Sequence, residues 1–293
     1  MRGGKKPLGI MGGSLGLILV LALGAAWAGE VPPEGDGEPT PWKDSAELSY
    51  VVTGGNTSTS AFSLANTLKR GWGKDVLTIR TFILRNNTTT STRTAVGTET
   101  DFQVLEQRVE RLVAENYLLA TQYDRWIAKR LLAQAQLSWD RNRFAGVASR
   151  VTLTAGAGWA MVEAKKTQIK SEAGVTYTLR RYVGQSTTSF AGFRVNLMGS
   201  YQPMEKSAVA TQFIFDDNLK NTVDWRFDWI NSVSATISKS FALKTSVRFL
   251  YAHLPALETL PLLTPAGDPT GLTVQVPLRK LDTFFTTSLV INF

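Results

Sequence analysis

Strand-length segments of alternating polarity recur along this chain, and they constrain its fold more than any other feature. In LLAQAQLSW (131–139), apolar side chains at odd positions alternate with mostly polar ones. In VTLTAGAGWAM (151–161), apolar residues alternate with Thr and Gly, and TTSLVINF (286–293) continues the pattern to Phe293. Because successive side chains of a β-strand point to opposite faces, each segment predicts a strand with one apolar face.

Similar segments predict an antiparallel all-β protein of about twelve strands, an even number as in bacterial single-chain barrels. The expected strands lie at about 45–53, 60–70, 75–85, 114–123, 131–139, 151–161, 169–180, 189–201, 207–216, 223–238, 242–252 and 279–293. Short gaps alternate with long or polar gaps, as periplasmic turns alternate with extracellular loops. The short gaps are 71–74, 124–127, 163–167, 202–206 and 239–241, and the long ones are 86–100, 140–149, 181–188 and 253–275.

Aromatic residues gather near both ends of these expected strands. Near the short gaps lie Trp72, Trp126, Trp159, Tyr201 and Phe293; near the long ones lie Trp139, Tyr182, Trp225 and Tyr251. Two such belts are typical of a membrane barrel, whereas a soluble β-sandwich, the alternative, shares only the strand spacing. After the N-terminal leader, no run of 18 apolar residues occurs, so only strands closed into a barrel could span a bilayer.

The segment 102–115 allows two interpretations. Leu105, Val109 and Leu112 fit the period of a helix, but the same stretch also fits a strand that protrudes beyond the bilayer.

The N-terminus predicts an exported protein. Basic residues in MRGGKK precede an apolar run from Leu8 to Leu23, and Ala26-Trp27-Ala28 resembles a signal-peptidase site. A single membrane-anchoring helix is the alternative, but the run is glycine-rich and marginally short. We therefore expect a signal peptide (1–28), a Pro/Gly-rich periplasmic tether (29–44) and a barrel (45–293).

Composition excludes several functional classes. None of the 293 residues is cysteine, which excludes disulfides and thiolate chemistry. The net charge of +8 falls to +5 without the leader, and the basic residues form no block, so nucleic-acid binding is not expected. No Walker, zinc-site or G-x-S-x-G pattern occurs, and we expect no metal and no cofactor.

Charged residues at inward positions predict the character of a lumen. A charge on the lipid face is costly, so charges within strands should face inward. The expected lumen charges are Arg80, Lys170, Glu172, Arg194, Arg226, Asp228, Lys244 and Arg248, with Arg180, Glu47 and Asp282 as further inward positions. Basic residues exceed acidic ones, which fits either a narrow anion-favouring pore or a plugged barrel. Asn231 falls on the apolar face and indicates a bulge or a shifted register.

An outer-membrane hydrolase acting on lipid or peptide is the alternative function. Such enzymes commonly use a His beside a Ser or Asp, and His253 is the single histidine. Pro255 stands where a nearby Ser would be needed. The carboxylates Asp216 and Asp217 fit a solvated loop rim, and Gly156 and Gly158 fit the relief of crowding in the barrel wall. We therefore expect no enzyme and no catalytic residue.

Three segments resemble the family of salt-induced outer-membrane proteins. They are LSYVVTGGNTSTSAFSLANTLKRGWGKD (48–75), WDRNRFAGVASRVTLTAGAGW (139–159) and KLDTFFTTSLVINF (280–293). The resemblance covers about residues 45–293 and implies a monomeric barrel in the outer membrane, in contact with lipid and lipopolysaccharide, with a link to salt or osmotic stress. Resemblance to outer-membrane proteins in general also implies an assembly signal, read by the barrel-assembly machinery, at Phe285, Leu289, Ile291 and Phe293.

The leader generates the first prediction. The mature protein should begin at Gly29, since cleavage is expected after Ala28. N-terminal sequencing of the protein from outer-membrane fractions tests this, and residues 1–28 still attached there would contradict it.

Overall fold

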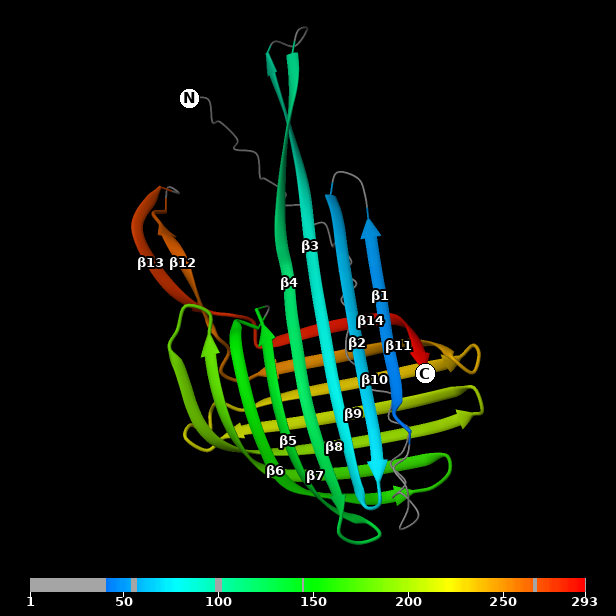
Figure 1. Ribbon diagram of the computed structural model, residues 1–293. Coiled ribbons are helices and arrows are strands. Elements are labelled where there is room, and N and C mark those ends of the chain that lie inside the picture. The colour runs from blue at the N-terminus through cyan, green and yellow to red at the C-terminus, as the bar shows by residue number, and fades with distance from the viewer. Residues whose placement is uncertain (1–40, 54–56, 98–101, 144, 266–267, 293) are drawn as a thin grey trace, which may run out of the picture.

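Twelve antiparallel strands close into a barrel, and two further strands form a separate hairpin (Figure 1). The computed structural model describes residues 41–53, 57–97, 102–143, 145–265 and 268–292. The strands are β1 (Lys43–Thr53), β2 (Thr57–Trp72), β3 (Asp75–Gly97), β4 (Phe102–Trp126), β5 (Leu131–Asn142), β6 (Val147–Glu163), β7 (Thr167–Tyr182), β8 (Thr187–Met204), β9 (Ser207–Asn218), β10 (Arg226–Thr236), β11 (Phe241–Ala252), β12 (Leu257–Leu263), β13 (Pro269–Pro277) and β14 (Leu281–Asn292).

Each barrel strand pairs with its neighbour in the chain, except that β14 pairs with β11 because β12 and β13 stand outside the barrel. The first and last strands close the sheet through four pairs, from Ser45 opposite Asn292 to Leu48 opposite Leu289. In Figure 1 strands β1–β4 cross in front of β7–β11 at a steep angle, as tilted strands on opposite walls of a barrel do. The prediction of an antiparallel barrel of about twelve strands is confirmed.

The two faces of the wall have opposite polarity. Large apolar side chains point outward and are exposed, including Val175 (67% exposed), Leu137 and Leu153. Polar side chains point inward and are buried, such as Gln122, Thr154 and Ser246. This is the reverse of a soluble protein, in which an apolar core is expected inside. The pleat of the strand therefore converts the sequence alternation into an apolar exterior and a polar interior.

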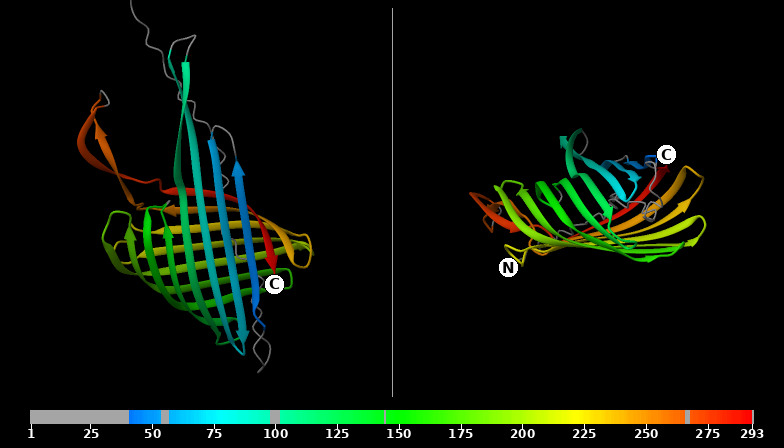
Figure 2. Two further views of the ribbon diagram at one scale, coloured as in Figure 1. Left: turned by 45° about the horizontal axis from the view of Figure 1, so that its top comes forward. Right: turned by 60° about the horizontal axis from the view of Figure 1, so that its bottom comes forward.

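Two predicted loops are in fact strands. The segment 86–100 was expected to be a loop, but β3 continues to Gly97 and pairs with β4 from Phe102 onward. The stretch 102–115 is thus a strand, and the helical interpretation is wrong. A bulge between Asn86 and Asn87 lies close to the point where β4 ceases to pair with β5, at Asn116, while β2 stays paired with β3 as far as Thr90. Figure 2 shows the β3–β4 hairpin and the β12–β13 hairpin projecting from the barrel, the latter from the segment 253–275 expected to be a loop.

Aromatic rings form a continuous patch on the outer face of β8–β11. The ring centroids of Phe213 and Phe227 lie 5.6 Å apart, those of Phe227 and Tyr251 5.2 Å, and those of Trp225 and Tyr251 5.1 Å. Trp126, by contrast, faces inward and packs against Leu132 and Ala160, so it is not part of an outer belt.

Asn231 lies on the outer face as its register predicted, and no bulge occurs in the pairing of β10 with either neighbour. Its side-chain oxygen accepts a 2.9 Å hydrogen bond from the Thr211 hydroxyl, which in turn accepts one from the Trp229 indole. The neighbouring strand therefore satisfies the side-chain oxygen of this outward-facing amide, and no register shift is needed.

Glycines allow the wall to bend tightly at β6–β8. Gly156 lies directly opposite Gly174 on the inner face. A Cβ on Gly156 would lie 2.1 Å from the Ala173 carbonyl oxygen and 2.5 Å from the Gly174 Cα. Because real Cβ atoms do not approach backbone this closely, only glycine fits the curvature here.

The described residues contain no helix with the length and apolar character needed to span a bilayer.

Replacing Gly156 by Ala should therefore destabilise the barrel, by about 1–3 kcal/mol as for other overpacked sites. Gly199→Ala is the matched control, because its Cβ would meet only the Thr211 methyl group at 3.3 Å. The temperature at which the folded band is lost in heat-modifiability gels measures the effect. Equal loss for both variants would contradict a local clash at Gly156.

The signal peptide, residues 29–40 of the tether and Phe293 lie outside the described residues. The described barrel begins at Lys43, two residues before the expected boundary. Phe285 and Leu289 lie on the exposed outer face of β14, as does the half-buried Ile291.

Candidate functional site

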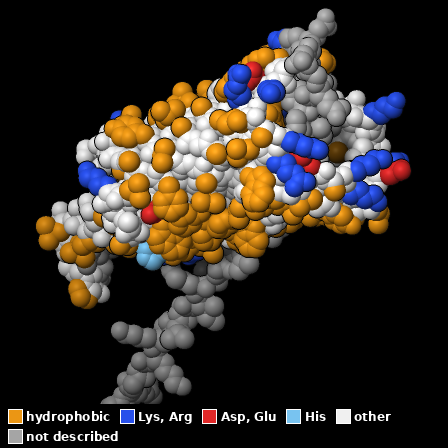
Figure 3. All heavy atoms as spheres, turned by 90° about the horizontal axis from the view of Figure 1, so that it is seen from below, with side chains coloured by type: hydrophobic (Ala, Val, Ile, Leu, Met, Phe, Trp, Pro, Cys, Tyr) orange, Lys and Arg blue, Asp and Glu red, His pale blue; other side chains and the backbone are white. Residues whose placement is uncertain are grey.

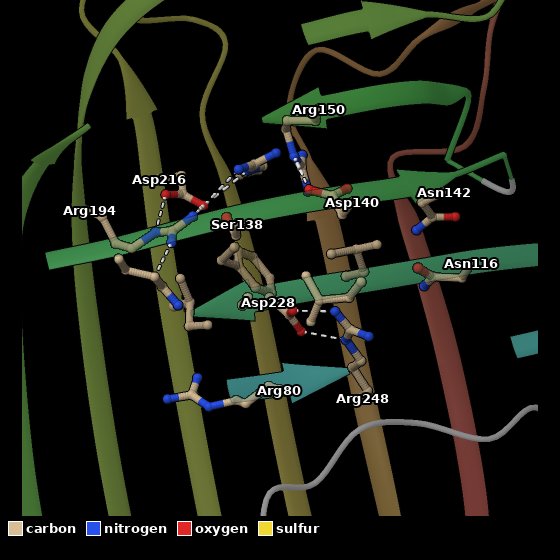
Figure 4. A pocket seen from close by; sticks show the side chains of 17 residues that line it. Arg80, Asn116, Ser138, Asp140, Asn142, Arg150, Arg194, Asp216, Asp228 and Arg248 are labelled. Atoms are coloured by element: carbon tan, nitrogen blue, oxygen red, sulfur yellow. Dashed lines mark hydrogen bonds and ion pairs between the residues drawn. The ribbon is translucent and has the colours of Figure 1, made fainter. Parts of the chain in front are cut away.

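An arginine-rich cavity of about 150 Å³ lies inside the barrel (Figure 4). Strands β3–β6 and β8–β11 all contribute to it, so opposite walls converge here. Its charged lining consists of Arg80, Arg150, Arg194, Arg226, Arg248, Asp140, Asp216 and Asp228. With five arginines and three aspartates, the cavity carries more positive than negative groups.

Asp216 holds two of these arginines together. Its carboxylate accepts a 2.7 Å hydrogen bond from Arg194 Nε on β8 and a contact of 3.0 Å from an Arg226 terminal nitrogen on β10. Figure 4 shows Asp216 beside Arg194, joined to it by dashed lines. Arg194 also donates a 3.0 Å bond to Gln136 of β5. Because β5 and β8 are three strands apart, this bond crosses the interior.

The other two aspartates each hold one arginine. Arg150 Nε donates to Asp140 at 2.7 Å between β6 and β5. Arg248 Nε donates to Asp228 at 2.7 Å between β11 and β10, and a second Arg248 nitrogen completes a bidentate pair. Bidentate pairing fixes the plane of a guanidinium, and each arginine keeps further N–H donors beyond those its carboxylate accepts.

Apolar residues occupy the interior beside the cavity. Leu118 and Leu250 line the cavity and also pack against a cluster of Ala65, Phe82, Leu84 and Phe284. These side chains come from β2, β3, β4, β11 and β14 and so join neighbouring parts of the wall across the inside. The open cross-section of the barrel is narrowed accordingly.

A second polar network lies toward the end of the barrel that carries the short turns. Lys170 contacts Glu172 at 2.9 Å and Asp124 at 3.6 Å. Gln122 joins it, donating to Asp124 at 3.0 Å and accepting a 2.8 Å bond from Arg80. Arg80 therefore connects this network to the cavity. All of the carboxylates in it are nearly inaccessible to solvent.

Two smaller groups complete the inward charges. Lys244 contacts Glu47 at 2.8 Å, across β14, and thereby ties β11 to β1 near the closing seam. At the opposite end, Arg180 contacts Asp224 at 2.6 Å. Arg180, Asp224 and Asp282 line a further cavity of about 50 Å³ that lies beside the first.

All eight predicted lumen charges lie on the inner face of the barrel. Arg80, Arg194, Arg226, Asp228 and Arg248 meet in the cavity, whereas Lys170 and Glu172 belong to the second network and Lys244 to the seam.

Among the described residues, the inward charges that the sequence analysis missed include Asp124, Asp140, Arg150, Asp216 and Asp224. Asp216 was expected on a solvated loop rim, which is wrong because β9 extends to Asn218 and places it inside. The alternation Gln212, Ile214, Asp216 already carried the signal. Asp124, Asp140 and Arg150 were missed for the same reason, since the strands are longer than the segments that the alternation outlined. The interior thus holds more carboxylates than predicted.

His253 lies outside the lumen network. Its ring stacks on Trp225 with centroids 4.9 Å apart, and its Nδ1 lies 3.2 Å from the Tyr251 hydroxyl. Within the part of the chain that the structure describes, no group of three or more His, Cys, Asp or Glu side chains could hold a metal ion.

The buried Lys170 network yields a stability prediction. Lys170→Met should cost about 3–5 kcal/mol, because Glu172 and Asp124 would then lose a buried cationic partner. Lys170→Met with Glu172→Gln should lose less, since it removes one of the stranded charges. Unfolding of the purified protein in urea measures both, and a double variant as unstable as the single one would contradict the assignment.

Structural similarity extends to the NanC porin (8% identity, 85% of this chain, 98% of that one, TM-score 0.43). It also extends to an outer membrane channel from Pseudomonas putida F1 (9%, 90% and 98%, 0.44) and an anion-selective porin from Comamonas acidovorans (12%, 87% and 100%, 0.38). No curated protein matches in sequence. A family model matches residues 46–260, and the chain therefore belongs to the family described as "Protein of unknown function, DUF481".

Proposed function

We propose that this protein is a non-enzymatic outer-membrane β-barrel that provides a narrow passage for small anions. The observation that carries the proposal is the cavity inside the barrel, which five arginines and three aspartates line. Its small volume limits the size of a solute, and its excess of guanidinium groups favours negative charge. Low-dielectric walls strengthen this preference, because they focus the field of the lining charges.

The polarity of the wall supports a location in the outer membrane. Its exposed outer face is apolar over the barrel strands, and its interior is polar. In water such a surface would be an aggregation hazard. In a bilayer it lies against the lipid tails, which are also apolar. The closed sheet also pairs backbone groups that hydrocarbon cannot satisfy.

Closure within one chain supports a monomer. β1 pairs with β14, so no second copy is needed to complete the sheet. Lipid and, in the outer leaflet, lipopolysaccharide would then surround the barrel. The outward Phe285, Leu289 and Ile291 on the closing strand, followed by Phe293, support recognition of this strand by the barrel-assembly machinery.

A link to salt or osmotic stress is part of the proposal and rests on the resemblance of three sequence segments alone. A narrow charged passage is compatible with it, since the field of its wall charges is screened as ionic strength rises.

Ion selectivity tests the passage. In planar bilayers under a KCl gradient, the reversal potential should indicate a weak preference for anions that shrinks at high salt. Arg194→Gln with Arg226→Gln should abolish the preference, because three arginines would then face three aspartates. Asp216→Asn should change selectivity in the opposite direction.

The matched control is Arg181→Gln with Lys220→Gln, which removes the same charge from exposed positions outside the cavity. This variant should keep the preference for anions. A robust cation preference in the unmodified protein contradicts the charge argument, and absence of conductance in many reconstituted bilayers contradicts the passage.

The alternative, a hydrolase, makes a different prediction. Hydrolysis of lipid or peptide by the purified protein, lost in His253→Ala, would support it. The stacking of His253 on Trp225 outside the lumen favours a structural role for this ring.

A further inference from the structure

The five short turns at one end of the barrel carry a marked excess of positive charge. These turns comprise 73–74, 127–130, 164–166, 205–206 and 237–240. Each of them contains at least one basic residue, and together they contain Lys74, Lys129, Arg130, Lys165, Lys166, Lys206 and Lys239 against Glu205. We name these seven side chains the basic rim. Figure 3 shows Lys and Arg side chains gathering toward one end of the barrel.

The opposite end has a smaller excess. The described connections there, including the link from β12 to β13, contain four basic residues, Arg143, Lys220, Arg279 and Lys280, and two acidic ones, Asp224 and Asp268. The net charge of the chain is therefore distributed unevenly between the two ends.

Backbone hydrogen bonds join the five short turns in series around this end of the barrel. The Trp126 N–H donates to the Lys74 carbonyl at 2.8 Å, and the Ala160 N–H donates to the Arg130 carbonyl at 2.9 Å. Equivalent bonds join Gln202 to Lys166 at 2.8 Å and Thr236 to Lys206 at 2.7 Å. Each turn is thereby joined to the next hairpin around this end of the barrel, so the five turns lie side by side.

The rim side chains are exposed and have no internal counter-charge. All seven are exposed to solvent. Across the ranges that the structure describes, none of the seven takes part in an ion pair. Their charge is therefore available to a partner outside the chain.

Exposed apolar side chains accompany the rim. Ile127 (61% exposed) and Ile237 (64%) lie within two of the turns, and Met204 (71%) immediately precedes a third. Large apolar groups beside lysines suit the interface of a bilayer, where the apolar part enters the lipid and the ammonium reaches the headgroups. A purely aqueous partner would leave the apolar groups in water. The apolar outer face of the barrel also continues directly to these turns.

We propose that the basic rim binds the anionic phospholipid headgroups of the leaflet at the short-turn end of the barrel. Each ammonium would lie at the level of the lipid phosphates, where a negative surface attracts basic residues close to it. The rim would then fix the depth and orientation of the barrel in the membrane. This inference rests on the proposed membrane location but not on the selectivity of the passage.

Lipid composition tests the proposal. The purified folded protein is reconstituted in vesicles of phosphatidylcholine, with and without about one third phosphatidylglycerol, at low salt. Phosphatidylglycerol should raise the temperature at which the barrel unfolds in heat-modifiability gels. The shift should shrink as NaCl rises from about 0.05 to 0.5 M, because salt screens exposed charges.

Two variants of equal charge locate the effect. The rim variant combines four substitutions, Lys129→Gln, Lys165→Gln, Lys206→Gln and Lys239→Gln. It should lose most of the phosphatidylglycerol shift. The control replaces Arg143, Lys220, Arg279 and Lys280 by Gln at the other end and should keep it. All eight positions are exposed, so both variants should fold.

Several results would overturn the proposal. These are the same shift in the rim variant as in the unmodified protein, or no shift at all. A different result would assign the rim to the cell wall instead: the unmodified protein binds isolated peptidoglycan, the rim variant does not, and neither responds to phosphatidylglycerol. Failure to insert into vesicles, detected by flotation, would contradict the proposed membrane location itself, whereas insertion without a lipid effect contradicts this inference alone.

Discussion

The structure depends on one short set of backbone hydrogen bonds, those that pair β1 with β14. Four residue pairs close twelve strands into a barrel, whereas β11 and β14 share eleven pairs. Without closure both strands would be open edges, which in a bilayer leave backbone groups without partners and in water template aggregation. The contact of Lys244 with Glu47 reinforces this seam from inside, since it joins β11 to β1 across β14.

Closure also explains why so many charges can be tolerated inside. Once the sheet is closed, inward positions from all strands face a common interior, and an arginine on one strand can reach a carboxylate on another. Asp216 serves two arginines, and Lys170 reaches a carboxylate three strands away. Buried ion pairs add little net stability compared with an apolar filling, because desolvation offsets their attraction. Their retention in the cavity therefore favours a role in handling charged solutes.

The two ends of the barrel differ in construction. At one end, short turns are fixed to one another and carry exposed lysines. At the other, the β3–β4 and β12–β13 hairpins project beyond the wall. Exposed apolar residues on β12 and β13, such as Leu260 and Val274, face each other across this second hairpin. A barrel with unlike ends has a defined orientation, which both a directed passage and a lipid-binding rim require.

The sequence by itself determined the barrel and, within the segments where the alternation is clear, which residues face its interior. Alternation along each strand is a local property, so the inward positions of Arg194 and Lys244 followed from their neighbours alone. It did not determine where strands end, because polar residues such as the threonines after Asn87 suit a protruding strand as well as a loop. Only the tertiary structure decided which charges meet. Asp216 reaches both Arg194 and Arg226 because the register of β8, β9 and β10 places the three residues side by side, and register is set by pairing between strands rather than by any one of them.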